Sequence, residues 1–170
     1  KVKIQKKKIL SFEISSKKKI ILISIKENIK YFEEVNLGAD LYDFCKDFKI
    51  KNYFINSNAL VNFSSNSLLN FLHGFRLKSY SFDKYKSKKN DKNFFITVFG
   101  KNILQPKDQI KFKAIEEGTF YARDLVSEPG NVLHPDEYAK RINSLRKLGL
   151  KINILDEKKL KKLGMNTLLG

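Results

Sequence analysis

Two hydrophobic patterns alternate along the first hundred residues of the chain. Short apolar runs, rich in β-branched and aromatic residues, occur at residues 20–25 (IILISI), 52–55 (NYFI) and 94–99 (FFITVF). Between these runs the apolar residues recur every three or four positions, which is typical of a helix with one buried face. Strands that alternate with helices predict a largely parallel sheet with helices on both faces.

The separate runs suggest different places in that sheet. Residues 20–25 are almost continuously apolar, so we expect a central strand that is covered on both faces. Residues 9–14 (ILSFEI) alternate less cleanly and are predicted to form an edge strand. Helices are predicted at residues 37–48 and 68–75. The buried stripe expected for the first of them is Leu37, Leu41, Phe44, Cys45 and Phe48.

A long helix is predicted after the third strand. Pro106 opens a helical pattern that continues to Leu125, and Pro129 predicts its end. Gly118 lies inside this pattern, where glycine costs about 1 kcal/mol relative to alanine. We therefore expect another backbone to approach Gly118 closely.

Helix signals continue after this long helix. Pro135 stands at a helix start, and Gly149 lies just beyond the predicted end. Residues 152–155 are predicted to form a strand, after which Asp156 caps a short helix that Gly164 closes. The expected buried stripe of the first helix is Tyr138, Ile142 and Leu145. Residues 83–93 are polar enough to form a mobile loop.

The net charge of +16 favours a polyanionic partner such as nucleic acid. Only four of the 34 basic residues are arginine, however, and arginine is the side chain whose planar fork suits base edges and phosphates. The excess of lysine, isoleucine, asparagine and phenylalanine is what an AT-rich genome produces. Nucleic acid therefore remains an alternative partner, and most lysines are expected to solvate the surface.

The number of cysteines and the length of the hydrophobic runs indicate the cellular compartment. Cys45 is the single cysteine, so no disulfide can form within the chain, and we expect it to pack in the core. No run approaches the roughly 20 apolar residues of a membrane span. The basic start of the chain has too short an apolar stretch for a signal peptide. We predict a cytoplasmic protein without a membrane partner.

Candidate catalytic chemistry is sparse. The two histidines, His73 and His134, have no second ligand at metal-binding spacing. The adjacent carboxylates are Glu116 with Glu117 and Asp156 with Glu157; neighbours on a helix point in different directions, so we expect them to be solvated. The sequence contains no phosphate-binding glycine loop and no nucleophile elbow. We predict no catalytic, cofactor-binding or metal-binding residue among these 170 positions.

Residues 74–87 (GFRLKSYSFDKYKS) combine aromatic and basic side chains. We expect Gly74 to allow close helix packing and the rings of Tyr80, Phe82 and Tyr85 to be buried. The alternative is a stacking platform for single-stranded nucleic acid.

These residues, together with residues 114–135 (AIEEGTFYARDLVSEPGNVLHP), resemble the leucyl aminopeptidase (cytosol aminopeptidase) family. The second segment is similar to the family's ARDLVNEP-like helix end, with Ser127 where the family usually has asparagine and Gly130 where it has alanine. His134 stands where the family usually has a threonine N-cap, which weakens the cap.

The resemblance implies an α/β fold with a mixed, largely parallel, macro-domain-like sheet flanked by helices. A long connecting helix and the first βα elements of a second α/β domain would follow. The implied divisions are 1–105 for the N-terminal domain, 106–134 for the connecting helix and linker, and 135–170 for the beginning of the catalytic domain. Because the chain starts at Lys1 and stops on apolar residues, we expect a fragment. Arg123 and Asp124 could be catalytic, but their place on a connecting helix favours ion pairs that fix the angle between domains.

For the full-length enzyme, the resemblance implies removal of N-terminal amino acids, often leucine, from peptides. Two divalent ions, manganese or zinc, would activate the attacking water, and the enzyme would assemble as a hexamer. The family's metal ligands lie beyond Gly170, so the fragment would bind no metal and be inactive. The alternatives are a basic α/β module that binds nucleic acid, or an oligomerisation and gating domain.

Overall fold

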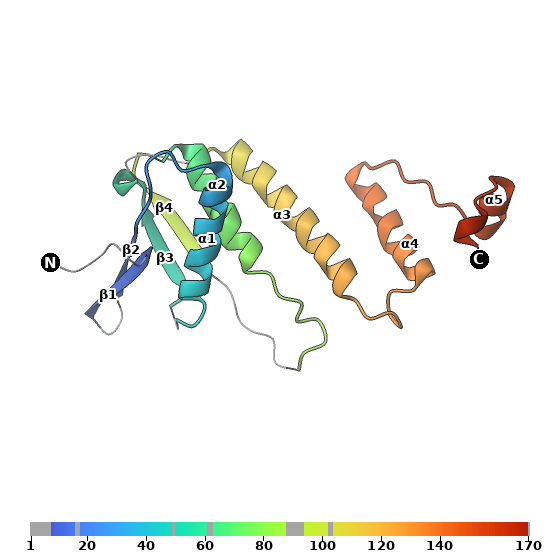
Figure 1. Cartoon of the computed structure of the whole chain (residues 1–170), viewed down its shortest axis with the longest axis horizontal. Helices are drawn as coiled ribbons and strands as arrows, with labels where there is room; N and C mark the ends of the chain where they lie inside the picture. The colour runs from blue at the N-terminus through green and yellow to red at the C-terminus, as the bar shows by residue number, and fades with distance from the viewer. Residues whose placement is uncertain are drawn as a thin grey trace. The chain divides into compact units, whose positions relative to one another are not determined.

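The computed structural model describes residues 8–15, 18–48, 50–60, 63–87, 94–101 and 104–169. The chain divides into two compact units, Lys1–Tyr121 and Ala122–Gly170, and the division falls inside the longest helix. Figure 1 shows the elements in chain order, coloured from blue to red. The strands are β1 (Ile9–Ser15), β2 (Lys18–Ile23), β3 (Asn52–Asn56) and β4 (Phe95–Phe99). The α-helices are α1 (Tyr31–Cys45), α2 (Ser65–Lys78), α3 (Pro106–Ser127), α4 (Pro135–Ser144) and α5 (Glu157–Lys162).

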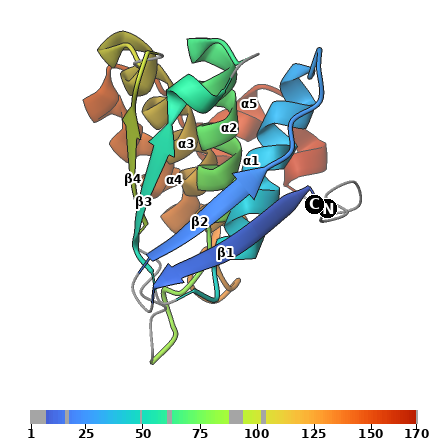
Figure 2. The same cartoon turned by 90° about the vertical axis from the view of Figure 1, so that its left-hand side faces the viewer.

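The four strands form two separate pairs. β1 and β2 pair antiparallel, with Ile9 opposite Ile23, whereas β3 and β4 pair parallel, with Asn52 opposite Phe95. In Figure 2 all four strands lie in one layer, with α1 and α2 behind it. The mixed α/β class is therefore confirmed. Among the described elements, however, helices cover only one face of this layer, so the expectation of helices on both faces is wrong for them.

The strand at residues 20–25 differs from its expectation in the same way. Among the described strands β2 bonds only to β1, and Ile20 and Leu22 are exposed on the open face. Only the alternate residues, Ile21 and Ile23, pack against the core. A continuous apolar run predicts a strand covered on both faces, but here the described chain covers one face.

One hydrophobic core lies between the strand layer and the two helices. Its buried residues come mainly from α1 and α2, and both strand pairs pack against it. Cys45 is fully buried there, as expected, but Phe48 lies beyond the end of α1. The buried apolar residues are Ile9, Leu37, Leu41, Tyr42, Cys45, Phe63, Leu68, Leu69, Phe71 and Phe75.

Two glycines allow α1 and α2 to pack backbone against backbone. A Cβ atom added at Gly38 would clash with the carbonyl of Phe71, and one at Gly74 would clash with the carbonyl of Val35. The close packing expected at Gly74 is confirmed. Nearby, Asn70 donates a hydrogen bond of 2.7 Å to the buried carboxylate of Glu34, which adds a polar link between the helices.

Helix α3 follows its prediction at both ends, but Gly118 does not. A Cβ atom at Gly118 would meet no other atom within 4 Å, so no backbone approaches it and that expectation is wrong. Contacts of α3 in the first unit include two between aromatic rings: Phe112 lies 5.2 Å from His73, and Phe120 lies 5.3 Å from Tyr80. Tyr85, expected to be buried, is 55% exposed.

The second unit contains helices and turns. Asp156 caps α5 by accepting a hydrogen bond of 2.9 Å from the Lys159 amide, and Gly164 adopts a positive φ beyond it, as predicted. The strand predicted at residues 152–155 is absent from the described structure, because no described strand pairs with it. Tyr138, expected in a buried stripe, is 47% exposed, and α4 has no fully buried residue.

The predictions of a mobile loop and of no membrane span can be compared only with the described residues. Of the predicted mobile loop, residues 88–93 lie outside the described residues. Among the described helices, none combines the length and apolarity that crossing a membrane requires.

Candidate functional site

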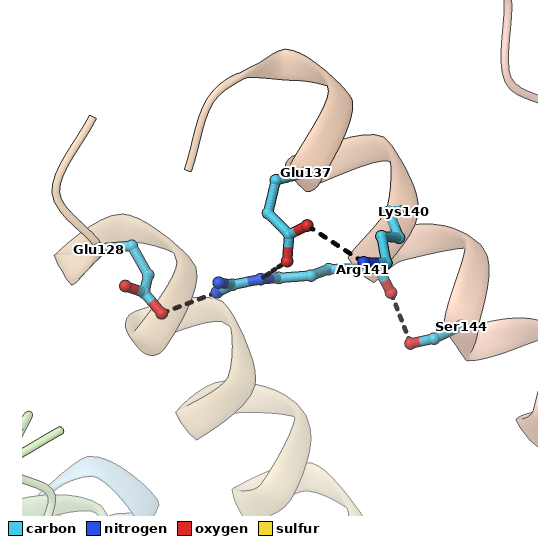
Figure 3. Close-up of polar contacts among 5 residues, drawn as sticks. All are labelled: Glu128, Glu137, Lys140, Arg141 and Ser144. Carbon is cyan, nitrogen blue, oxygen red and sulfur yellow. Dashed lines mark hydrogen bonds and ion pairs between the residues drawn. The ribbon is translucent and has the colours of Figure 1, made fainter. Parts of the chain in front are cut away.

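The second unit contains a buried carboxylate held by an arginine. The side chain of Glu128 is only 1% exposed, and its Oε1 accepts a hydrogen bond of 2.7 Å from Nη1 of Arg141. Nε of the same guanidinium donates to Oε1 of Glu137 at 3.0 Å. Figure 3 shows Arg141 extending from α4 to the end of α3, between the two carboxylates. We call Glu128, Glu137 and Arg141 the carboxylate clamp.

Local sequence places these three groups. Pro129 prevents α3 from continuing, so Glu128 stands immediately after the last helical residue. The backbone then turns, with the amides of Val132 and Leu133 both bonding to the Pro129 carbonyl at 2.9 Å. Glu137 and Arg141 are four residues apart on α4, which brings them to the same face of the helix.

Charge pairing shifts the pKa values of Arg141 and Glu137 in the carboxylate clamp. Hydrogen bonding to Glu128 and then to Glu137 raises the pKa of Arg141 above its usual value. The pKa of Glu137 is lowered, chiefly by its hydrogen bond from Arg141. The guanidinium therefore stays charged and occupied by two carboxylates. This arrangement suits a structural role, because a carboxylate that is already paired with arginine is a poor proton acceptor.

His134 begins α4 without a capping bond. It occupies the N-cap position, and its side chain makes no hydrogen bond to the helix amides, as the sequence predicts. Pro135 at the first helical position and two acidic residues in the first turn, Asp136 and Glu137, support this helix end instead.

A second buried polar pair lies in the first unit. Nδ1 of His73, on α2, is 2.9 Å from Oε1 of Glu116, on α3, and both side chains are largely buried. The expectation that Glu116 is solvated is therefore wrong. Its neighbour Glu117 is exposed and pairs with Lys113 at 3.8 Å, as a solvated carboxylate would. Asp156 and Glu157 are also exposed.

The buried cysteine has no catalytic character. Burial raises the pKa of the Cys45 thiol to about 11, and none of its side chain is exposed. A reactive cysteine needs the opposite combination, a lowered pKa together with access to solvent.

Metal-binding geometry can be tested on the described residues directly. Over residues 8–169, apart from the gaps given above, no three or more His, Cys, Asp or Glu side chains are grouped so that they could hold a metal ion. The residues present therefore do not fit a metal centre. That no residue of the chain is catalytic, or binds a cofactor or metal, remains a prediction.

Comparisons with known proteins connect the clamp region to a family. Residues 120–170 match the family model described as the cytosol aminopeptidase family, catalytic domain. A probable cytosol aminopeptidase from Bradyrhizobium sp. is 42% identical over 107 residues, which is 57% of this chain and 20% of the relative. Another, from Phytoplasma mali, is 39% identical over 134 residues, or 72% of this chain and 27% of the relative. The chain belongs to the cytosol aminopeptidase family.

Solved structures support the fold of this family member. A tomato leucine aminopeptidase mutant matches 92% of this chain and 33% of its own, with a TM-score of 0.75 and 19% sequence identity. The bottromycin maturation enzyme BotP matches 92% of this chain and 35% of its own, with a TM-score of 0.69 and 18% identity. At this level of identity the likeness concerns the fold alone.

The match to the cytosol aminopeptidases is partial in length. The chain spans between a fifth and about a quarter of the curated relatives described above. The catalytic-domain match begins inside α3 and includes the whole clamp. The resemblance read from the sequence is thereby confirmed.

Sequence reasoning missed the clamp itself. The four-residue spacing of Glu137 and Arg141 is a visible helix pairing signal. Burial of Glu128 had no such signal, because it depends on the turn after Pro129. Arg123 and Asp124, expected to fix the angle between domains, remain a prediction.

Proposed function

We propose that these 170 residues form part of a metallo-aminopeptidase that removes N-terminal amino acids, often leucine, from peptides. The observation that carries this proposal is the match of residues 120–170 to the family's catalytic domain. The identity of about 40% with several curated cytosol aminopeptidases supports it. Residues 1–105 would act as the N-terminal domain, and α3 would connect them to the catalytic part.

The chemistry of the whole enzyme is proposed to depend on two divalent ions, manganese or zinc. The described residues do not fit such a centre, so its ligands would come from sequence outside this stretch. The role proposed for this chain's own residues is positioning: the carboxylate clamp would hold the start of α4 against the end of α3. The full-length enzyme is proposed to be a cytoplasmic hexamer.

The test compares this chain with the product of its gene. The coding DNA on both sides of the stretch would be sequenced and translated in frame, and both proteins would be assayed with leucine p-nitroanilide and Mn²⁺. We expect the chain alone to show no turnover and a longer product to hydrolyse the substrate. The proposal fails if the gene encodes no further residues, or if a longer product is inactive with Mn²⁺.

A further inference from the structure

One face of α3 contacts the end of α2 within the first unit. Phe112, Glu116 and Phe120 are four residues apart on α3, so they share this face. Phe112 meets the ring of His73 edge-on, with the ring centroids 5.2 Å apart. Phe120 lies 5.3 Å from the ring of Tyr80, just after α2. Glu116 is therefore the charged member of an otherwise aromatic contact face.

The attachment of α3 to the first unit is shallow. Every residue of α3 is described, and none of them is fully buried. By contrast, α1 and α2 cross with their backbones in contact and supply most of the core. An isolated helix of about 15 residues is only marginally stable in water. The stability of residues 106–121, the part of α3 in the first unit, therefore depends on how well their side chains contact the rest of that unit.

A largely buried polar contact lies within this attachment. Nδ1 of His73 is 2.9 Å from Oε1 of Glu116, and the two side chains are 7% and 15% exposed. An ionised carboxylate can only accept, so Nδ1 carries the hydrogen that joins the two groups. The pair then has two forms. With a neutral imidazole it carries one negative charge, whereas with a protonated imidazole it has no net charge.

These two forms differ in how favourably they are buried. A buried charge without a counter-charge is costly, and a hydrogen-bonded ion pair recovers much of that cost. The protonated pair should therefore dock α3 onto α2 more firmly than the neutral imidazole does. Histidine is the side chain that commonly changes charge between about pH 5 and about pH 8. The contact can thus respond to pH within this range.

Charged groups of opposite sign flank the pair on α1 and α2. The buried carboxylate of Glu34, on α1, accepts a hydrogen bond of 2.7 Å from an asparagine one turn before His73 on α2. One turn after His73, the guanidinium of Arg76 lies over the ring of Phe120, 5.3 Å from its centroid. Glu34 favours a positive charge on the imidazole and Arg76 opposes it. Glu116 therefore decides the sign, because it is in direct contact with the ring nitrogen.

The next carboxylate on α3 provides a contrast. Glu117 is 67% exposed, and its Oε1 lies 3.8 Å from Nζ of Lys113 on the same helix. Solvent screens this pair, and both of its members belong to α3, so it does not fasten the helix to α2. Glu116 and Glu117 are therefore matched positions for substitution.

We propose that His73 and Glu116 form a pH-sensitive latch that fastens α3 to α2. The closed latch is the ion pair of imidazolium and carboxylate, which forms at mildly acidic pH. Loss of the histidine proton as the pH rises leaves the buried carboxylate without a counter-charge, and the docking of residues 106–121 weakens. The latch acts within the first unit and is independent of peptidase activity.

Hydrogen exchange of the whole chain tests the latch. After correction for the intrinsic effect of pH on exchange, the protection of amides 106–121 should rise by about threefold or more from about pH 8 to about pH 6. His73→Asn keeps a donor near the position of Nδ1 but gains no proton, and Glu116→Gln removes the carboxylate charge. Both variants should lose the pH-dependent increase. Equal protection of α3 at both pH values in the unaltered chain would overturn the proposal.

Two controls locate the effect. Glu117→Gln changes the neighbouring, exposed carboxylate and should retain the full pH dependence. The amides of α1 report on the folding of the first unit and should show no matching change over the same pH range. An increase that persists in Glu116→Gln would assign the response to another group. An equally large increase in α1 would assign it to the stability of the whole unit, and either result would refute the latch.

Discussion

Tyr42 combines good packing with an unsatisfied polar atom. Its ring makes edge contacts with Phe75 and Phe94, at centroid distances of 5.3 and 5.4 Å. Its hydroxyl is buried and has no hydrogen-bond partner among the described residues. Burial raises the pKa of this phenol. The ring therefore stabilises the core, while the hydroxyl opposes that stabilisation.

Removing that hydroxyl should stabilise the protein. We expect Tyr42→Phe to raise the free energy of unfolding by about 1 kcal/mol, because it removes the desolvation cost and keeps the ring contacts. Urea unfolding followed by circular dichroism measures the change. Tyr31→Phe, at a residue that is 61% exposed, is the control and should leave stability unchanged. A loss of stability in Tyr42→Phe would show that the hydroxyl has a partner.

Cys45 should make the free energy of unfolding depend on pH in the alkaline range. Burial raises its pKa from 9.0 to about 11, so the folded chain retains a proton that the unfolded chain releases. Stability is therefore complete below about pH 8.5 and falls as the pH rises through 11, by up to about 3 kcal/mol. Urea unfolding at a series of pH values measures the slope. Cys45→Ala should flatten it, leaving the part due to Tyr42 and Tyr53, whose pKa values burial also raises. An unchanged slope would exclude the thiol as the cause.

The carboxylate clamp should respond asymmetrically to substitution. Arg141→Met removes the guanidinium that lies 2.7 Å from the buried carboxylate of Glu128 and should destabilise the α3–α4 junction. The double variant Glu128→Leu with Arg141→Met should recover most of this loss, because it removes the buried carboxylate together with its cation. Hydrogen exchange of the α4 amides measures both effects. If the single and double variants exchange equally fast, the clamp does not stabilise the junction.

At the scale of elements, hydrophobic periodicity correctly predicted several helices and strands whose formation depends on local sequence. Helix α3 begins at Pro106 as predicted, and β3 and the capped helix α5 also follow their expectations. The strand expected at residues 152–155 failed, because a strand needs a partner that the described chain does not supply. The prediction that β2 is covered on both faces was wrong for a related reason. An apolar run indicates that a strand is buried, but it does not indicate which segment covers the strand.

The candidate site was less predictable than the elements. The contact between His73 and Glu116 joins residues 43 positions apart, and no local spacing reveals such a pair. The family could be identified nevertheless, since the residues that carry the resemblance form two short continuous segments, 74–87 and 114–135. A sequence motif consists of neighbouring residues and can be recognised locally. The partner of a buried polar group depends instead on how the elements pack together.

Glycine substitutions should separate helix packing from helix propensity. Gly38→Ala and Gly74→Ala would each force α1 and α2 apart, and we expect each to cost about 2 kcal/mol or more. Gly118→Ala, in open space on α3, should instead stabilise by about 0.5–1 kcal/mol. Thermal unfolding ranks the three variants. Comparable effects at all three positions would contradict the backbone contacts described here.

At the scale of the molecule, the two units should differ in local stability. The first unit has a continuous hydrophobic core, whereas Glu128 is the one buried residue among residues 122–169. Amide exchange should therefore be protected in α1 and α2 and much faster in α4 and α5, because local opening there exposes little apolar surface. Mass spectrometry of exchange followed by digestion measures this. Equal protection in both units would indicate that the second unit is stabilised by contacts beyond its own residues.

The close backbone contacts at Gly38 and at Gly74 also have a consequence for the gene. Glycine codons begin with two guanines, and any change in either of those bases introduces a side chain or a stop. In a coding sequence whose composition drifts toward adenine and thymine, such codons are under steady pressure to change. At these two positions the protein accepts no outcome of that drift, since every replacement places a carbon atom inside a neighbouring backbone. The helix crossing thus sets a local limit on how far mutational bias can reshape the chain.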